Sequence, residues 1–576
     1  MKLKGAQIFF ECLKKEGVEV VFGFPGGAVL DLYHEMAAHA HDIRHILVRH
    51  EQGAAHMADG YARASGRVGV CLVTSGPGAT NTVTGIATAY MDSIPMVIFT
   101  GQVPTPLIGD DAFQEVDIIG ITRPCTKHSY LVRDVNDLAR VIKEAFYLAR
   151  TGRPGPVLVD LPKDVIQAQA DFKYPQKVHL PGYRPTVEAH AGQVRKACEF
   201  IARAKAPVIF AGGGIVISGS SEELTRLARL IQAPVTCSLL GLGGYPATVP
   251  APEGGRRADP LWLGMPGMHG TYQANMALSH ADLILAVGVR FDDRVTGKIS
   301  TFAPKAKIVH IDIDPTSISK NIDVDIPIVG DCRNALLQFL EVFEKEPLPG
   351  LEDSRAAWLD QISRWEKEHP LTYSPSQELI KPQFVIEKLH EIAGENAIIT
   401  TEVGQHQMWT AQFYKFDRPR TLLTSGGLGT MGFGFPAALG AQAAFPHRLV
   451  VDIAGDGSIQ MNVQELCTAV CNNLPVKVVI INNTYLGLPR QWQEMFYNKN
   501  YTGSCIEGAP DFVKLAEAYG AVGLRAERPD QVEPVLRQGL SIAAPVFMDF
   551  LVAREENVYP IVPPGKSITE MLLTQL

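Results

Sequence analysis

Apolar residues in this chain occur in short runs separated by stretches with helical spacing. Residues 449–454 (LVVDIA) and 476–482 (VKVVIIN) are two such runs, and both are rich in β-branched side chains. Runs of this kind predict strands that are buried on both faces, as in a parallel sheet. The stretch between them, residues 458–474, has the length of one crossover helix, so together they predict a βαβ unit.

The alternation of apolar strand and amphipathic helix continues along nearly the whole chain and predicts an α/β fold with parallel sheets. Two stretches interrupt it. Residues 168–190 are polar and contain prolines, and residues 344–378 are charged and rich in helix-breaking residues. We place domain boundaries there and predict three doubly wound parallel-sheet domains, spanning residues 1–170, 190–345 and 375–560.

One segment of the first domain resembles one segment of the third. Residues 68–101 and 449–483 both contain an apolar strand, a Gly-X-Gly turn, a helix, a proline and a second apolar strand. This order is the general plan of βαβ units, and it also fits two related domains on either side of a different middle one. Only the second segment has an acidic residue in the turn and an asparagine pair, so the two segments differ in role.

Composition and charge narrow the class of protein. With 576 residues the chain is too long for one core, and 46% hydrophobic and 20% charged residues are ordinary for a globular protein. The net charge of −8 argues against nucleic acid or an anionic membrane as a partner. No apolar run reaches transmembrane length, and the lysine-bearing N-terminus lacks the apolar core of a signal peptide.

The nine cysteines are scattered, with no Cys-X-X-Cys pair. This pattern predicts free thiols in a reducing compartment, and we expect a cytoplasmic protein. Cys467 and Cys471 fall on one face of a predicted helix, and we interpret them as core packing rather than as a redox pair.

Polar residues follow the two apolar runs at 449–454 and 476–482. A Gly-Asp-Gly turn (455–457) comes after the first run, and an asparagine pair ends the second. Because both strands of a right-handed βαβ unit end at one edge of the sheet, we expect Asp456 and Asn483 to lie side by side. A carboxylate oxygen and an amide oxygen suit Mg²⁺, and a flexible glycine-containing turn at the start of a helix suits the diphosphate that the metal would hold.

The Gly-Asp-Gly turn and the spaced asparagine pair resemble the signature of thiamine diphosphate enzymes. The resemblance implies that Mg²⁺ is held by Asp456, Asn483 and the backbone carbonyl of Tyr485. It also implies contacts to thiamine diphosphate from three further places in the sequence. These contacts are Pro25, Gly26, Gln405, His406, Gly455, Gly457 and Ser458.

Glu51 opens a predicted helix after the strand that ends near Arg49 and His50. A carboxylate is favoured at a helix N-terminus for electrostatic reasons alone. The resemblance gives Glu51 another role, as the glutamate that shares a proton with N1′ of the aminopyrimidine and so activates the cofactor. Because Glu51 and the metal ligands lie in different domains, the family builds its site between two subunits, which implies a homodimer or homotetramer.

Residues 424–434 contain five glycines, which are costly unless the backbone approaches another group closely. The resemblance implies that the Gly429 carbonyl accepts a hydrogen bond from N4′ and that Met431 keeps the cofactor bent. A methionine here is also compatible with simple core filling.

Within thiamine diphosphate enzymes, the chain resembles the large catalytic subunits of the acetohydroxyacid synthases (acetolactate synthases) over nearly its whole length. Four of the motifs are PGGAVLDLY (25–33), DAFQE (111–115), GVRFDDRVTG (288–297) and QWQ (491–493). The RFDDR sequence implies the FAD-containing biosynthetic type. Apolar runs of the middle domain that end in glycine or acid also suit a nucleotide. The FAD contacts implied are Arg153, Met268, His269, Gly270, Arg290, Asp312 and Asp314.

The resemblance implies that pyruvate is decarboxylated and that the two-carbon unit is joined to a second pyruvate or to 2-ketobutyrate, a step of branched-chain amino acid biosynthesis. Arg294 would pair with the acceptor carboxylate, although it could equally form an ion pair with Asp292 or Asp293. Trp492 would pack on the extra methyl group of 2-ketobutyrate. The other implied residues are Gln114 and Lys163 in catalysis, and Gly27, Ala28, Phe113, Met268, Asp293 and Leu488 along the channel.

The sequence departs from the family at two places. YLGLP (485–489) places Pro489 beside the channel, where its ring fixes φ and removes an N–H. Residues 253–260 form an extra basic, glycine-rich bulge, and Pro266 follows it. The family also implies a separate small regulatory subunit. Two other interpretations stay open: another FAD-bearing thiamine enzyme such as pyruvate oxidase, and a catalytically silent regulatory or scaffold homologue.

Overall fold

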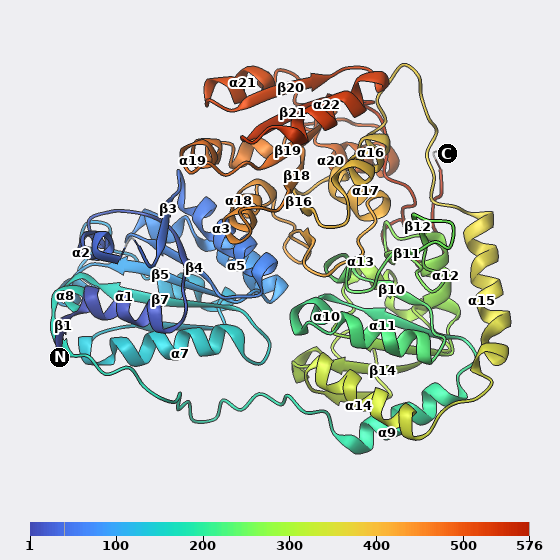
Figure 1. Ribbon diagram of the computed structural model, residues 1–576, viewed down its shortest axis with the longest axis horizontal. Helices are drawn as coiled ribbons and strands as arrows, with labels where there is room; N and C mark the ends of the chain where they lie inside the picture. The colour runs from blue at the N-terminus through green and yellow to red at the C-terminus, as the bar shows by residue number, and fades with distance from the viewer. Residues whose placement is uncertain (40, 575–576) are drawn as a thin grey trace.

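The computed structural model describes residues 1–39 and 41–574, which form three α/β domains around three parallel sheets. Figure 1 shows the N-terminal domain in blue, the central domain in green and the C-terminal domain in orange and red, arranged around a common centre. Helices cover the sheets on both faces. The predicted class, three doubly wound parallel-sheet domains, is confirmed.

The N-terminal sheet has the strand order β3-β2-β4-β5-β7-β6, and all neighbouring strands are parallel. Its four inner strands are buried and largely apolar, as expected for a sheet covered on both faces, whereas the two edge strands, β3 and β6, are partly exposed. The strands are β2 (Val20–Phe24), β3 (Arg44–Leu47), β4 (Gly69–Val73), β5 (Met96–Gln102), β6 (His128–Leu131) and β7 (Pro156–Pro162). The main helices are α1 (Gly5–Lys15), α2 (Leu30–Met36), α3 (Glu51–Ser65), α5 (Val83–Asp92), α6 (Ile118–Thr122), α7 (Leu138–Arg150) and α8 (Lys163–Gln167).

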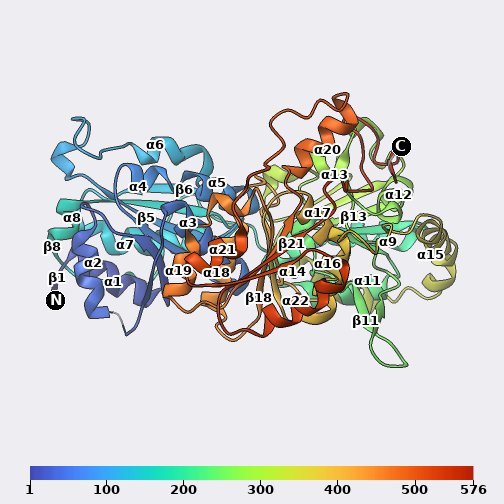
Figure 2. The same cartoon turned by 90° about the horizontal axis from the view of Figure 1, so that it is seen from above.

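The central sheet has the order β10-β9-β13-β14-β15 and is also parallel throughout. Its strands are β9 (Pro207–Ala211), β10 (Val235–Cys237), β13 (Leu283–Val287), β14 (Lys307–Asp312) and β15 (Ile326–Val329). Its main helices are α9 (Ala191–Arg203), α10 (Gly213–Ser218), α11 (Ser221–Leu230), α12 (Tyr272–His280), α13 (Asp293–Thr296) and α14 (Cys332–Lys345). The basic bulge predicted at 253–260 is the tip and second strand of an antiparallel hairpin, β11 (Thr248–Pro250) and β12 (Arg256–Ala258), that projects from the molecule (Figure 2).

The C-terminal sheet has the order β17-β16-β18-β19-β21-β20, again with parallel neighbours. Its strands are β16 (Ile398–Thr401), β17 (Leu422–Leu423), β18 (Val450–Gly455), β19 (Lys477–Asn482), β20 (Val522–Ala526) and β21 (Val546–Leu551). Its helices are α16 (Pro382–Ala393), α17 (Gln405–Phe413), α18 (Gly434–Ala444), α19 (Glu465–Cys471), α20 (Gly487–Phe496), α21 (Phe512–Ala518) and α22 (Pro529–Ser541). The helix in the crossover between β18 and β19 is shorter than expected. Helix α19 has only seven residues, and a 3-10 turn precedes it.

Part of the second predicted boundary is a helix. Residues 351–368 form α15 (Leu351–Glu368), which packs beside α12 (Figure 1). Trp358 is buried in this contact, and its indole Nε1 donates to the Pro207 carbonyl at 3.1 Å. The first predicted boundary contains a linker without regular structure. Residues 172–190 form no helix or strand and cross from one domain to the next.

The last residues of the chain return to the central domain. Ile568 lies in the central core with Val295 and Phe302. The Val562 N–H donates to the Met268 carbonyl at 2.8 Å. The central domain is therefore completed by a segment that follows the C-terminal sheet.

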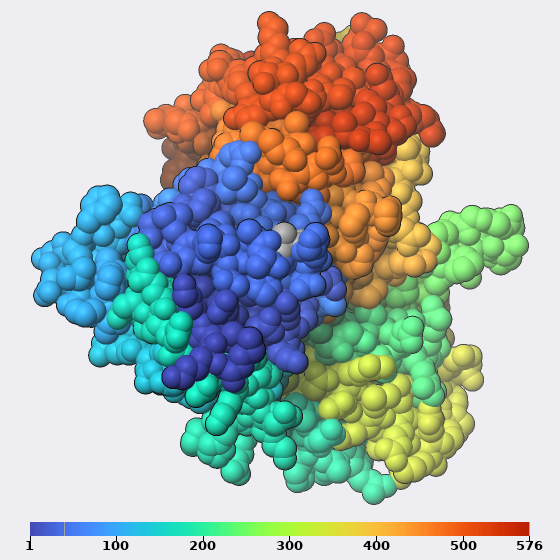
Figure 3. Space-filling model, turned by 60° about the vertical axis from the view of Figure 1, so that its left-hand side comes forward, coloured from blue at the N-terminus to red at the C-terminus, as the bar shows by residue number. Residues whose placement is uncertain are grey.

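The N-terminal and C-terminal domains pack directly against each other, and Figure 3 shows their blue and orange surfaces meeting. The contact runs along α3 and α18. Gly60 makes this approach possible, because a Cβ at that position would lie 2.2 Å from the Ala437 carbonyl oxygen. Among residues 1–39 and 41–574, we find no helix that has both the length and the apolar character needed to cross a membrane.

Candidate active site

The end of the C-terminal sheet brings the predicted metal ligands together. Strands β18 and β19 are neighbours, with Gly455 opposite Ile481, so Asp456 and Asn483 emerge at the same edge. Both line a small pocket. The other residues that line it include Gln405, His406, Met431, Gly455, Gly457, Ser458 and Tyr485, all of them predicted cofactor or metal contacts.

The donor set fits a hard divalent cation. Asp456 is 1% exposed, and its Oδ2 has no hydrogen-bond partner among the described residues. Burial raises the pKa of Asp456 to about 7, which shows how poorly its environment supports an unpaired charge. The Asn483 side chain is held by the Tyr485 N–H, which donates to Oδ1 at 3.1 Å, and by Gln405, whose Oε1 accepts from Nδ2 at 3.2 Å. A cation beside these oxygens would supply the missing positive charge.

Glu402, which the sequence analysis did not single out, joins the two loops of this pocket. Its carboxylate accepts from Ser458 Oγ at 2.7 Å, from the Gly432 N–H at 2.6 Å and from the Phe435 N–H at 3.0 Å. Ser458 belongs to the Gly-Asp-Gly loop, and Gly432 follows Met431. Burial raises the pKa of Glu402, against the effect of these hydrogen bonds. Glu402 therefore fixes the Met431 segment relative to the Gly-Asp-Gly loop.

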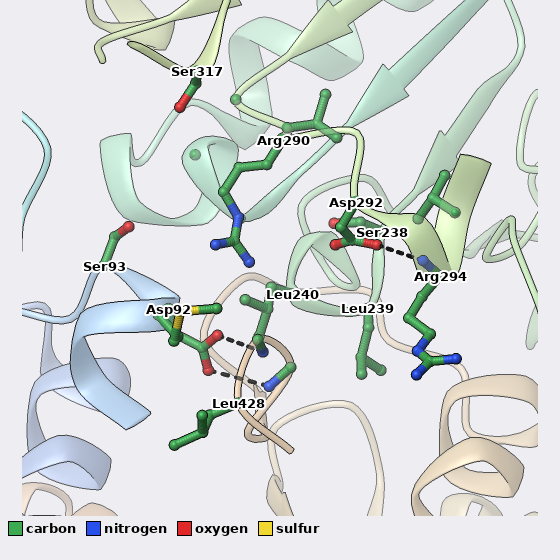
Figure 4. A pocket seen from close by; sticks show the side chains of 18 of the residues that line it. Asp92, Ser93, Ser238, Leu239, Leu240, Arg290, Asp292, Arg294, Ser317 and Leu428 are labelled. Atoms are coloured by element: carbon green, nitrogen blue, oxygen red, sulfur yellow. Dashed lines mark hydrogen bonds between the residues drawn. The ribbon is translucent and has the colours of Figure 1, made fainter. Parts of the chain in front are cut away.

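A larger pocket of about 830 Å³ lies where the three domains meet (Figure 4). Its volume is within the range of small-molecule and cofactor sites. Residues from all three domains line it. The predicted site residues among them are Arg153, Met268, His269, Arg290, Asp293, Arg294, Asp312, Gly429, Leu488 and Trp492.

One wall of the larger pocket has the features of a nucleotide site. Strands β9 and β13 end there in glycine loops so close together that a Cβ on Gly288 would lie 2.6 Å from the Gly214 Cα. Gly288 also has a φ of +60°, in the left-handed region. Asp312 ends the neighbouring strand β14, and burial raises its pKa to about 6. Arg290 points into the pocket in Figure 4. Close backbone, a cation and an acid at strand ends are what a dinucleotide requires.

Two of the predicted flavin contacts do not line this pocket. Asp314 instead forms an ion pair with Arg153, in which guanidinium and carboxylate are 3.1 Å apart, and so helps to hold an arginine that does line it. Gly270 lies in the tight turn next to His269.

Arg294 and Trp492 face the same pocket from different domains. Arg294 is exposed, and its guanidinium is 3.8 Å from the Asp293 carboxylate, a loose pair in solvent. Asp292 caps the backbone of α13 rather than the side chain of Arg294, as Figure 4 shows. Trp492 lies on α20, one turn after Leu488. The charge of Arg294 is therefore largely available to a ligand.

Pro489 is placed where its missing N–H does little harm. It is the third residue of α20, and the first four N–H groups of a helix have no partner within the helix. The departure at YLGLP is therefore compatible with a regular helix that carries Leu488 and Trp492 to the pocket.

A network of buried charged side chains holds the glycine-rich loop, residues 424–434, in place. The Asp92 carboxylate accepts from the N–H groups of Gly426 (3.1 Å) and Gly427 (2.7 Å), as Figure 4 shows. Arg63 donates to the same carboxylate at 2.8 Å, and it is also paired with buried Asp59. Arg63 and Asp59 lie on α3, and Asp92 ends α5. This network could not be predicted from the sequence, because α3, Asp92 and the glycine-rich loop lie far apart along the chain.

The remaining predicted residues gather at the carboxyl edge of the N-terminal sheet, outside both pockets. Glu51 is half-buried at the start of α3, and Asn81 Nδ2 donates to its Oε2 at 2.8 Å. Gln114 has a φ of +59°, a conformation that side chains rarely adopt. The others at this edge are Pro25, Gly26, Gly27, Ala28, Phe113 and Lys163. Within one chain, Glu51 thus does not line the pocket that holds Asp456.

These features define a cofactor-dependent enzyme of the thiamine type, and comparison with known families agrees. Residues 3–121, 194–339 and 402–550 match the N-terminal TPP-binding, central and C-terminal TPP-binding domains of thiamine pyrophosphate (thiamine diphosphate) enzymes. The chain belongs to this family and, within it, to the acetolactate synthase large subunits.

Three relatives show how similar the chain is to the acetolactate synthases. The chain is 49% identical to the acetolactate synthase large subunit of Haemophilus influenzae over 580 residues, covering 100% of this chain and 99% of the relative. It is 50% identical to the acetolactate synthase isozyme 3 large subunit of Escherichia coli over 578 residues, with the same coverage. It is 49% identical to the acetolactate synthase of Mycobacterium bovis over 576 residues, covering 99% of this chain and 91% of the relative.

Proposed function

We propose that this chain is the catalytic subunit of an acetolactate synthase, a transferase of branched-chain amino acid biosynthesis. It decarboxylates pyruvate and joins the two-carbon unit to a second pyruvate, giving 2-acetolactate, or to 2-ketobutyrate, giving 2-aceto-2-hydroxybutyrate. The observation that carries this proposal is the convergence in one pocket of Gly429 from the cofactor loop with Arg294 and Trp492, the groups suited to a 2-keto acid acceptor.

Thiamine diphosphate, Mg²⁺ and FAD are the cofactors we propose. Asp456, Asn483 and the Tyr485 carbonyl hold Mg²⁺, because Asp456 is buried with one oxygen unpaired. Arg153, Arg290 and Asp312 hold FAD in the larger pocket. Thiamine diphosphate, when bound, supplies the electron sink that decarboxylation of a 2-keto acid needs. The proposed reaction joins two 2-keto acids with loss of CO2 and involves no net oxidation or reduction, so FAD would not need to take up electrons.

The protein residues bind, orient and move protons. Glu51 holds a proton at N1′ of the aminopyrimidine, and the Gly429 carbonyl accepts from its amino group. Arg294 binds the carboxylate of the acceptor through its guanidinium, which is free to form two parallel hydrogen bonds. Gln114, Lys163 and Phe113 approach from the partner's N-terminal edge, because in a single chain they lie outside the pocket.

The test is product formation by the purified chain with pyruvate, Mg²⁺, thiamine diphosphate and FAD, each cofactor being omitted in turn. We expect 2-acetolactate only when all are present, without matching oxygen uptake. Oxygen uptake with formation of acetate or acetyl phosphate would identify an oxidase of the pyruvate oxidase type instead. A protein that binds the cofactors but turns nothing over, with or without a small regulatory subunit, would be a silent homologue.

Replacing Trp492 is expected to change acceptor choice. Trp492→Leu removes the indole that packs on the extra methyl group of 2-ketobutyrate, and one methylene is worth about 1–3 kcal/mol. The preference for 2-ketobutyrate over pyruvate should therefore fall roughly 10-fold or more, measured as the product ratio in a mixture of both acceptors. Phe496→Leu is the control, because Phe496 packs edge-on against Trp492 without lining the pocket. If Trp492→Leu gives the same product ratio as wild type, Trp492 does not determine the choice of acceptor.

A further inference from the structure

Two thiols lie together near Glu51, outside both pockets. Cys467 and Cys471 are one turn apart on α19, and their sulfur atoms are 3.9 Å from each other. Cys467 is half-buried and Cys471 is exposed. The pair is therefore not part of the core, and our interpretation of these cysteines from the sequence as core packing is wrong for Cys471.

A guanidinium faces both sulfurs. Arg49 Nη2 is 3.6 Å from Cys471 Sγ, and the contact with the Cys467 thiol is the main cause that raises the pKa of Arg49. Arg44 is close by, since its Nη2 donates to the Asn472 carbonyl at 3.2 Å. A cation beside a thiol favours the thiolate, which is the nucleophilic form. An exposed thiol beside a cation and a second thiol is the arrangement of a redox-reactive cysteine with its resolving partner.

The geometry allows a bond between the two sulfurs. Residues four apart on a helix have Cα atoms about 6 Å apart, inside the range that disulfides span. Their Cβ atoms are further apart than in a relaxed disulfide, so the last turn of α19 must tighten when the bond forms. In the described part of the chain no third histidine, cysteine or carboxylate completes a metal site with them.

We propose that Cys471 and Cys467 form a redox-modification site for low-molecular-weight disulfides such as oxidised glutathione. The Cys471 thiolate attacks one sulfur of the reagent, the reagent's S–S bond breaks, and one thiolate leaves. Cys467 then loses its proton and attacks the Cys471 sulfur, which releases the second thiol. In sum, two protein thiols are oxidised to one disulfide, and one reagent disulfide is reduced to two thiols.

The site is mechanically connected to Glu51. Helix α19 begins at Glu465, whose carboxylate accepts from the N–H groups of Arg49 (3.0 Å) and His50 (2.9 Å), immediately before Glu51. Formation of the disulfide tightens the other end of this seven-residue helix, and the Cys471 thiol is no longer available as a partner of the Arg49 guanidinium. We therefore expect the oxidised enzyme to turn over more slowly, an expectation that rests on the proposed function.

The chemical test uses the assembled enzyme with all cofactors, incubated with oxidised glutathione and digested without reductant for mass spectrometry. The peptide that contains both cysteines should lose two hydrogens. Cys467→Ser should stop the reaction at one glutathione on Cys471. Arg49→Gln should slow the reaction of Cys471, because it removes the cation beside the attacking sulfur. A Cys471 that does not react in the assembled enzyme would overturn the proposal.

Cys505 is the matched control. It is also exposed, and within the described residues it shares no hydrogen bond with a second thiol, so it can gain glutathione but cannot lose two hydrogens. If the peptide with Cys467 and Cys471 gains glutathione but never loses two hydrogens, the pair forms no disulfide and the proposal fails.

The link to activity is measured separately. Oxidised wild type should lose most of its turnover and regain it with dithiothreitol, whereas Cys471→Ser should keep its turnover under the same treatment. Equal loss in both proteins would disprove the link. A chain that makes no 2-acetolactate under any condition would count against the proposed function and would leave the mass results to decide on the thiol site.

Discussion

Glu51→Gln is expected to lower turnover by a factor of about 10² to 10⁴, the usual contribution of a positioned acid or base. The amide keeps the shape of the side chain and can turn its oxygen toward Asn81, which donates to Glu51 at 2.8 Å. It cannot exchange a proton with N1′ of the aminopyrimidine. Steady-state 2-acetolactate formation measures the effect, and binding of thiamine diphosphate and FAD should remain within a few-fold of wild type.

The control for this variant is Asn81→Ala. A hydrogen bond contributes about 1–3 kcal/mol, and Asn81→Ala leaves the carboxyl group of Glu51 in place, so it should reduce turnover less than Glu51→Gln does. Wild-type turnover in Glu51→Gln would exclude the proton-transfer role and leave Glu51 as a favourable charge at the start of α3.

Asp456→Asn is expected to weaken Mg²⁺-dependent binding of thiamine diphosphate by more than roughly 100-fold, the upper end of what loss of an outer-shell partner costs at metal sites. The reason is the charge: Asp456 is buried, and its unpaired oxygen faces the pocket with Asn483. Titration of the cofactor at fixed Mg²⁺, followed by quenching of protein fluorescence, gives the binding constant without any need for turnover.

Asp452→Asn is the matched control for Asp456→Asn. Asp452 is a buried aspartate on β18, the strand that Asp456 follows; its carboxylate accepts from Thr400 Oγ1 at 2.9 Å and does not line the pocket. Burial raises its pKa well above the usual value, so an amide resembles its neutral form. Cofactor binding should persist in this variant. If both variants bind the cofactor equally well, Asp456 is not a metal ligand.

The two catalytic variants together test the assembly. Because Glu51 lies outside the pocket of Asp456 in one chain, we propose that each site combines residues of two chains. Mixing inactive Glu51→Gln and inactive Asp456→Asn chains through unfolding or dissociation should then restore activity, since one site of each hybrid dimer has both residues. A mixture as inactive as its parts would place both residues in the same subunit's site.

The position of Asp456 and Asn483 at one edge of the C-terminal sheet could be predicted from the sequence because it depends on local features. Asp456 and Asn483 each follow one buried strand, and neighbouring parallel strands end at the same edge whatever the rest of the fold does. The fold class could be predicted for the same reason, since the alternation of buried runs and amphipathic helices is repeated in all three domains.

Other parts of the site depend on contacts across long stretches of chain. The Asp92 carboxylate binds Gly427 from 335 positions away, and nothing near Asp92 in the sequence indicates that partner. Glu402 follows strand β16 as one acid among many in the sequence, and only the fold shows that it accepts a hydrogen bond from Ser458. Helix α15 was hidden by its charged composition, because its buried apolar residues, Leu351, Trp358 and Ile362, form only a narrow stripe.

The return of the last residues to the central domain has a consequence for protein synthesis. Ile568 completes the central core, and the Pro560 carbonyl bonds His269 at 3.1 Å in the wall of the larger pocket. Ribosomes make these residues after every strand of the C-terminal sheet. The packing of the middle domain, although its own strands emerge second, can therefore be completed only after the whole C-terminal sheet has been made. The wall of the larger pocket that contains His269 is completed at the same late stage.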